Sequence, residues 1–338
     1  MSDGRTVSRR ALLLAGGALF LGACSTAEPP ASAPTTAPGA DSTRTRIPRS
    51  TPAEPSATVD VTIQRPSLPD LQPWRPTSNE IQPEAKLAAA RVIEALGTTT
   101  EPDGVADRLR AVGAEPRLAD QAGALVPPAA PAVAEIIYPQ YGGLTKSQAS
   151  IMTIARQTWV EGGQMRSRTV TADLRVSMAG DGWAVTEIKP VEPTELSTRS
   201  LTSKASELAS GSGVDLPDAA LVDLAAGVVD DMVLDALLSL ASHYQFSVSV
   251  FRAGHPDTVF GTNRTSNHTR GRAVDIWAIN RRPVVTMGTD DQTLLRFLEA
   301  ARDVGSDEIG GPIDPDGPGG AHFTDHVHRD HVHIGFEV

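Results

Sequence analysis

The sequence predicts an α+β protein with two small α+β domains, over 84–192 and 214–338, joined by a linker over 193–213. In each predicted domain, a stretch with apolar residues at helical spacing is followed by stretches in which apolar and polar residues alternate, as in half-buried strands. The length of 338 residues also exceeds what one small core requires, which favours two domains.

The first 23 residues are typical of an export signal. Arg9 and Arg10 precede a short apolar run that falls below the roughly 20 residues of a membrane span. The run ends in small residues before Cys24, the only cysteine of the sequence, as in a bacterial lipobox. We therefore expect a lipoprotein signal peptide with Cys24 as the lipidated residue; an ordinary signal peptide with a chance cysteine is the alternative. The arginine pair also resembles a twin-arginine export signal.

Residues 24–83 are predicted to be a disordered tether. Residues 25–80 hold 11 of the 26 prolines, with many Ala, Ser and Thr, and show little apolar periodicity. Such a segment buries too little apolar surface to offset its chain entropy. The expected product is an exported bacterial lipoprotein, anchored through its lipid to the outer face of the cytoplasmic membrane.

The first predicted domain begins with a helix and continues as an antiparallel meander. The helix is expected over 84–96, and strands are expected over 150–160, 165–178 and 183–188. This order resembles cystatin-like or NTF2-like folds. The segment carries no recognisable catalytic constellation. Trp159 and Trp183 are candidates for a ligand pocket, but we favour buried packing as their role.

The second predicted domain alternates helices and strands. Helices are expected over 228–243 and 292–304, and strands over 246–252, 272–279 and 330–336.

Coordinating side chains concentrate in two segments of this domain, 266–276 and 322–334. Asp275 interrupts an apolar strand, where a carboxylate is costly unless it is paired or bound to metal. His331 and His333 alternate with apolar residues, so both imidazoles project from one face of a strand. Two imidazoles and a carboxylate form a good zinc set, and a fourth position left for water makes such a site catalytic. His243 and His255 are expected at a helix end and in a loop, and His322 and His326 either along the cleft or in solvent.

The motif Ser266-x-His268-x-x-Gly271-x-Ala273-x-Asp275-Ile276, followed by His331-x-His333, resembles the zinc D-alanyl-D-alanine peptidases, a group related to hedgehog and lysostaphin-type domains. The resemblance covers roughly residues 245–338. It implies an antiparallel sheet with helices, and a Zn²⁺ ion bound by His268, Asp275 and His333. It also implies that Arg252 and Ser266 contact the substrate.

Two family patterns leave open which residue is the base that activates water. One branch has a glutamate three residues before the last zinc ligand, where this sequence has Asp330. Another branch has histidines five and two residues before it, which here are His328 and His331. We expect Asp330 to act with His331, and we keep His328 as the alternative.

The resemblance implies a hydrolase that cuts peptidoglycan stem peptides, as a carboxypeptidase or an endopeptidase. One alternative is an inactive zinc-bound domain that binds wall peptide or a protein; another is a structural lipoprotein in which the first domain does the binding. A net charge of −11, without a basic stripe, argues against nucleic acid as a partner. The expected partners are the stem peptide and, through the lipid anchor, the membrane.

Overall fold

The structure is a computed structural model, and its described residues belong to one compact unit that contains two sheets, each with its own hydrophobic core. The described residues are 67–101, 104–180, 182–192, 201–211 and 213–337. The fold is α+β, as predicted. The predicted signal peptide, Cys24 and most of the predicted tether lie outside the described residues. Among the described residues, no helix is long and apolar enough to span a bilayer.

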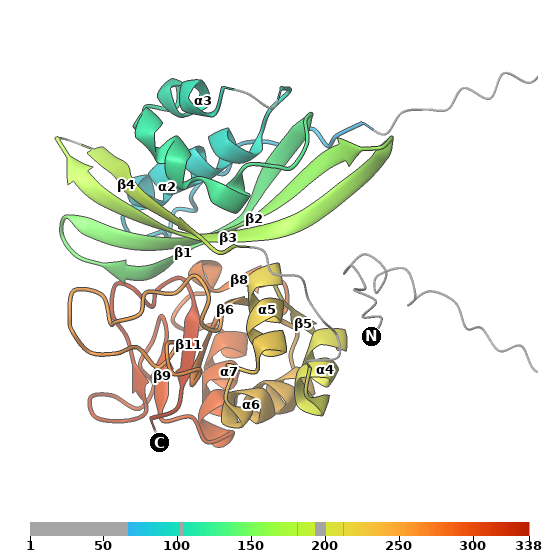
Figure 1. Cartoon of the computed structure of the whole chain (residues 1–338). Coiled ribbons are helices and arrows are strands. Elements are labelled where there is room, and N and C mark those ends of the chain that lie inside the picture. Colours follow the sequence, from blue (N-terminus) through green and yellow to red (C-terminus); the bar gives the residue numbers. More distant parts are fainter. Residues whose placement is uncertain (1–66, 102–103, 181, 193–200, 212, 338) are drawn as a thin grey trace, which may run out of the picture. The chain divides into compact units, whose positions relative to one another are not determined.

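The part of the structure that we call the N-terminal lobe, residues 67–192, is a helix-covered antiparallel meander. Helix α2 (Pro83–Gly97) confirms the helix predicted over 84–96, and helix α3 (Val105–Ala111) follows. Helix α2 contacts all four strands and covers one face of their sheet (Figure 1). The strands, which pair in sequence order, are β1 (Ala132–Leu144), β2 (Gln148–Glu161), β3 (Gln164–Ala179) and β4 (Gly182–Pro190).

Strands β2, β3 and β4 confirm the three predicted strands, whereas β1 has no counterpart among them. Pro139, Gly142 and Gly143 interrupt the expected alternation in this segment. β1 is an edge strand, where proline is tolerated. Two register shifts, between Ile136 and Tyr138 and between Tyr141 and Gly143, also break the period of two on which the prediction depends.

Strand β3 lies in a more buried environment than its sequence predicts. The alternation indicates a half-buried strand with Thr171 and Asp173 facing solvent, yet residues 170–174 are all buried. The second face of the sheet is covered by the rest of the compact unit: a Cβ added to Gly254 would lie 3.0 Å from Thr171 Cγ2. The polar face of the meander is therefore an internal surface. Trp159 is also buried, which fits the packing interpretation.

The part that we call the C-terminal lobe, residues 201–337, contains a mixed sheet with the strand order β10-β9-β11-β7-β6-β5 and with β8 paired to β7. The short pairs β5–β6 and β9–β10 are parallel and the others are antiparallel. The strands are β5 (Val214–Asp215), β6 (Phe246–Val250), β7 (Ala273–Ile279), β8 (Arg282–Pro283), β9 (Glu308–Gly310), β10 (His322–Phe323) and β11 (Val332–Gly335).

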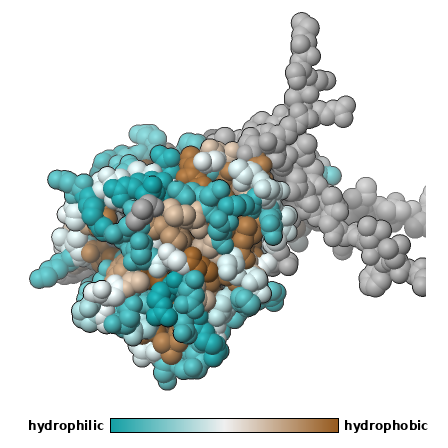
Figure 2. All heavy atoms as spheres, turned by 90° about the horizontal axis from the view of Figure 1, so that it is seen from below, coloured by the Kyte–Doolittle hydropathy of each residue, from teal (hydrophilic) through white to brown (hydrophobic). Residues whose placement is uncertain are grey.

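The helices of this lobe are α4 (Ser203–Ser210), α5 (Asp218–Ala226), α6 (Asp231–Ala241) and α7 (Gln292–Asp303). Helices α6 and α7 match the two predicted helices, whereas α4 lies within the predicted linker. Asp230 caps α6 by accepting a hydrogen bond from the Met232 amide at 3.0 Å. The apolar face of α6 enters the second core with strands β6, β7 and β11. On the face seen in Figure 2, hydrophilic residues surround scattered apolar patches.

Candidate metal site

Strands β7 and β11 place Asp275 opposite His333, because the two residues are direct partners in the antiparallel register. Side chains of directly opposed residues lie on the same face of a sheet. His268 comes from the loop before β7, where its backbone N–H donates to Ser266 Oγ at 3.3 Å. The turn after it needs Gly271, whose φ is +73° and where a Cβ would lie 1.8 Å from the carbonyl oxygen of Val228.

The donor atoms of His268, Asp275 and His333 converge. His268 Nε2 lies 3.1 Å from Asp275 Oδ1 and 3.1 Å from His333 Nδ1, and His333 Nδ1 lies 2.9 Å from Asp275 Oδ1. All three residues are buried. The structure therefore brings together the three residues that the sequence predicts as ligands.

The outer nitrogens of the two histidines face acceptors. His268 Nδ1 donates to the carbonyl oxygen of Phe251 at 2.6 Å, and His333 Nε2 lies 3.6 Å from Glu308 Oε2. With these outer nitrogens as donors, each ring can turn an unprotonated nitrogen toward Asp275 when a metal ion is bound. A carboxylate and two lone pairs that face one another need a positive charge between them, which is either a proton on His333 or a metal ion. Outer partners of this kind orient histidines that bind metals.

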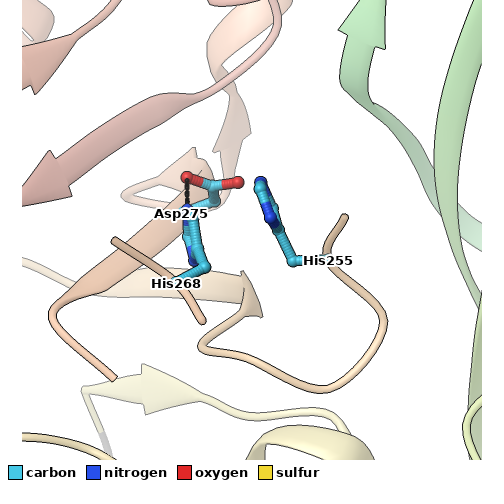
Figure 3. Close-up of side chains that lie close together, drawn as sticks. All are labelled: His255, His268 and Asp275. Atoms are coloured by element: carbon cyan, nitrogen blue, oxygen red, sulfur yellow. Dashed lines mark hydrogen bonds and ion pairs between the residues drawn. The ribbon is translucent and has the colours of Figure 1, made fainter. Parts of the chain in front are cut away.

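His255 joins this cluster, although the sequence predicts only a loop residue. One donor atom each from His255, His268 and Asp275 can be chosen so that all lie within 4.8 Å of one another, a group that could hold a metal ion (Figure 3). The His255 ring stacks on that of His268 with centroids 3.9 Å apart. Its Nδ1 donates to the carbonyl oxygen of Pro256 at 2.8 Å, which leaves Nε2 as an acceptor.

The charges in the cluster are strongly coupled. Burial raises the pKa of Asp275, but His268 and His331 outweigh it and hold the pKa well below its usual range. Burial lowers the pKa of His333, but Asp275 and Glu308 together raise it to about 9. The nearby imidazole of His333 lowers the pKa of Glu308 to about 2. Burial, followed by the charge of His268, lowers the pKa of His255 well below its usual value, so that ring is neutral.

The second carboxylate oxygen of Asp275 is held by the N-terminal lobe. Gln140 on β1 is fully buried, and its Nε2 donates to Asp275 Oδ2 at 2.7 Å. The amide oxygen of Gln140 accepts a hydrogen bond from Ser249 Oγ. The hydroxyl of Ser249 also lies 3.1 Å from the carbonyl oxygen of Asp275. The carboxylate is thus fixed from both lobes.

His331 lies beside the cluster, with Asp330 behind it. His331 Nδ1 donates to Asp330 Oδ1 at 2.6 Å, and its Nε2 lies 3.7 Å from Asp275 Oδ2. Asp330 is 2% exposed and does not line the pocket; its Oδ2 accepts from the Tyr141 amide at 3.1 Å and lies 2.5 Å from Lys86 Nζ. This placement differs from the expectation that Asp330 itself acts on water, because both of its oxygens are engaged away from the pocket.

His328 also lines the pocket. Its Nδ1 bonds Asp325 Oδ1 at 2.8 Å, and its ring centroid lies 5.0 Å from that of His331. Burial lowers the pKa of His328, against the opposing effect of Asp325. The hydrogen bond positions this imidazole at the mouth of the cluster.

A pocket of about 390 Å³ opens onto the cluster, in the size range of ligand sites. The N-terminal lobe supplies part of its wall through residues 141–144. Ser266 and His326 line it, whereas Arg252 does not; the Arg252 side chain is exposed, and its backbone N–H donates to Asp223. The expectation that Arg252 holds a substrate carboxylate therefore lacks support in the geometry. His322 is buried elsewhere, near Leu298 and Asp316.

Sequence reasoning missed Gln140, Lys86, His255 and Glu308. The first two come from the N-terminal lobe, and no local pattern connects them with the histidine-rich segments. Gln140 stands alone as a polar residue among Ile136, Ile137, Tyr138 and Leu144, which is the signal that could have found it.

No family model, no curated protein and no solved structure matches this chain.

Proposed function

We propose that this chain is a zinc-dependent peptidase that hydrolyses peptide bonds in peptidoglycan stem peptides. The convergence of His268 Nε2, Asp275 Oδ1 and His333 Nδ1, each within 3.1 Å of the other two, carries the proposal. Zinc ligands about 2.0–2.2 Å from the ion stand roughly this far apart in a tetrahedral site. The set of two imidazoles and one carboxylate fits Zn²⁺, and the outer hydrogen bond of His268 and the contact of His333 with Glu308 support that fit.

A zinc ion held there supplies a Lewis acid that polarises a carbonyl group and lowers the pKa of water toward about 7. The residues around it then handle the proton. His331 Nε2 faces both Asp275 and the pocket, so it can accept a proton from water and return it to the leaving amine. Asp330 fixes which nitrogen of His331 is free, and His328 stands near enough to assist.

The choice of stem peptide comes from the sequence motif and the export signal, and the pocket is compatible with it. The wall formed by residues 141–144 includes Gly143, whose lack of a side chain lets Phe260 pack beside it along the pocket. Asp325 and Glu308 make the lining acidic, whereas Arg264 is its positive residue. Such a lining can contact both the amino and carboxylate groups of a short peptide.

His255 favours a second candidate function, an inactive zinc-bound domain that recognises wall peptide or a protein partner. Structural zinc sites have four protein ligands, whereas catalytic sites leave one position open. If His255 Nε2 fills the fourth position beside His268 and Asp275, the site is closed to water.

Metal analysis combined with a muropeptide digest separates these functions. Wild-type chain, His268→Ala and His331→Ala are compared for zinc content and for release of D-alanine or cleavage of cross-links. The peptidase predicts stoichiometric zinc and cleavage in wild type, loss of both in His268→Ala, and loss of cleavage alone in His331→Ala. Zinc without cleavage in wild type supports the inactive domain. Absence of bound metal at pH 7 refutes the zinc proposal.

A further inference from the structure

We propose that Lys86 of helix α2 is a positioning residue for His331: it holds Asp330, and Asp330 holds the imidazole that faces the pocket. The role of His331 in proton transfer rests on the proposed function, but the positioning itself does not. The N-terminal lobe then has a specific part in the site, although no motif in that lobe indicates it.

Lys86 is buried in a place where an apolar residue is expected. Its side chain is 0% exposed, and its helical neighbours Ala85, Ala89 and Ala90 are also buried. A buried ammonium is costly unless it is paired and hydrogen-bonded. Lys86 satisfies this condition with Glu80, Asp330 and the hydroxyl of Tyr138 at 3.2 Å.

Two aromatic rings complete the surroundings of the ammonium. Lys86 Nζ lies 4.7 Å from the ring centroid of Tyr138 and 5.0 Å from that of Tyr141, within the range of cation–π contact. Tyr141 donates its hydroxyl to the carbonyl oxygens of Ile81 and Gln82, so its ring is fixed against the start of α2. These contacts hold the Lys86 ammonium against Asp330 of the C-terminal lobe.

Of the two carboxylates beside Lys86, Asp330 is the one whose charge the ammonium supports. Burial raises the pKa of Glu80, and Lys86 only partly opposes it. Burial also acts to raise the pKa of Asp330, but Lys86 and His331 outweigh it, so the pKa falls below its ordinary value. Asp330 is therefore an anion that needs a fixed cation.

The carboxylate of Asp330 is held on both oxygens. Oδ2 pairs with Lys86 Nζ at 2.5 Å and accepts a hydrogen bond from the Tyr141 amide at 3.1 Å. Oδ1 accepts a hydrogen bond from His331 Nδ1 at 2.6 Å. A carboxylate fixed in this way selects the His331 tautomer with its free nitrogen toward the pocket. Without Lys86, an unpaired buried anion either takes up a proton or rotates, and the imidazole loses its anchor.

The test compares Lys86→Met and Lys86→Arg in the full chain, with Lys189→Met as the matched control. Lys189 is an exposed lysine of the same lobe that pairs with Glu187 at 3.4 Å. We measure zinc content, kcat and KM on a muropeptide, and the low-field NMR signal of the His331 Nδ1 proton, assigned by its absence in His331→Gln.

Lys86→Met is expected to keep its zinc and to change KM by less than about twofold, while kcat falls at least about tenfold, which is a part of the roughly 10²- to 10⁴-fold that a positioned acid or base contributes. The low-field signal should be lost or broadened. Lys86→Arg should restore part of the kcat and part of the low-field signal. Lys189→Met should match wild type in both measurements. A folded Lys86→Met protein with an unchanged signal and unchanged kcat overturns the proposal.

Two further outcomes keep the proposal separate from folding and from the proposed function. If Lys86→Met does not fold, the double variant Lys86→Met with Glu80→Gln removes the second buried charge, and the same loss of signal is expected; an unchanged signal overturns the inference. If wild type has no peptidase activity, loss of the signal in Lys86→Met still supports the positioning role, and the proposed function alone fails.

Discussion

Replacement of Gln140 by leucine is expected to weaken zinc binding while leaving the chain folded. The amide donates to Asp275 Oδ2 at 2.7 Å from a fully buried position. Leucine has a similar volume but no donor, so the ligand carboxylate loses a hydrogen bond made at a fully buried position. Ser249 keeps a partner, because its hydroxyl lies 3.1 Å from the carbonyl oxygen of Asp275.

The size of the effect follows from the charge on Asp275. A hydrogen bond to a charged group contributes about 1.5–3 kcal/mol, and about 1.4 kcal/mol corresponds to a tenfold change in a binding constant. The Kd for zinc should therefore rise about 10- to 100-fold, which is also the usual range for partners that orient metal ligands. Competition with a chelating dye at fixed pH measures this Kd.

Gln157→Leu is the matched control. Gln157 is also buried, but its amide donates to the carbonyl oxygen of Leu125 rather than to the cluster. This variant should lose stability without a change in the Kd for zinc. A folded Gln140→Leu protein that binds zinc within about twofold of wild type would refute the argument that the N-terminal lobe orients Asp275.

His268→Ala should abolish stoichiometric zinc while circular dichroism stays native, and retained metal would contradict the ligand assignment. His255→Ala should keep its zinc, because three ligands remain; loss of the metal would instead favour the group of His255, His268 and Asp275. Gly271→Ala should destabilise the fold by more than about 1 kcal/mol in urea titrations, since φ is +73° and the new Cβ meets a backbone oxygen. Asp291→Ala should cost about 1 kcal/mol by removing the cap of α7, with Asp290→Ala as its control. Burial raises the pKa of Asp291, but Arg282 and the helix amides hold it below its ordinary value; its stabilisation is therefore present above about pH 4 and is lost as the pH falls further.

The residues of the proposed metal site could be predicted because local patterns carry them. His268 and Asp275 lie seven positions apart in one segment, and His333 belongs to a short alternating strand. The structure adds the register, in which Asp275 and His333 are direct partners. Helices α2, α6 and α7 could also be predicted from the sequence, because their apolar residues recur at helical spacing.

Tertiary packing decides what the sequence leaves open. The sequence indicates solvent beside Thr171 and Asp173, but a second lobe covers that face. Gln140 and Lys86 reach the site across 135 and 244 positions of the chain, to Asp275 and Asp330, and no spacing rule encodes such contacts. Spacing alone also favours Asp330 as the base, whereas the fold turns its carboxylate away from the pocket.

The position of β11 has a consequence for the order of assembly. This strand lies between β7 and β9 in the sheet, although it follows both of them in the sequence. The β9 and β7 sides of the sheet are therefore joined only when β11 pairs with both, and contacts over long sequence separations form slowly. Because His333 lies on β11, a partial chain that ends before β11 contains His268 and Asp275 but lacks the third proposed ligand. We expect tight metal binding only after β11 has paired with its neighbours. The metal ion would then bind a sheet that is already formed and would not direct its formation.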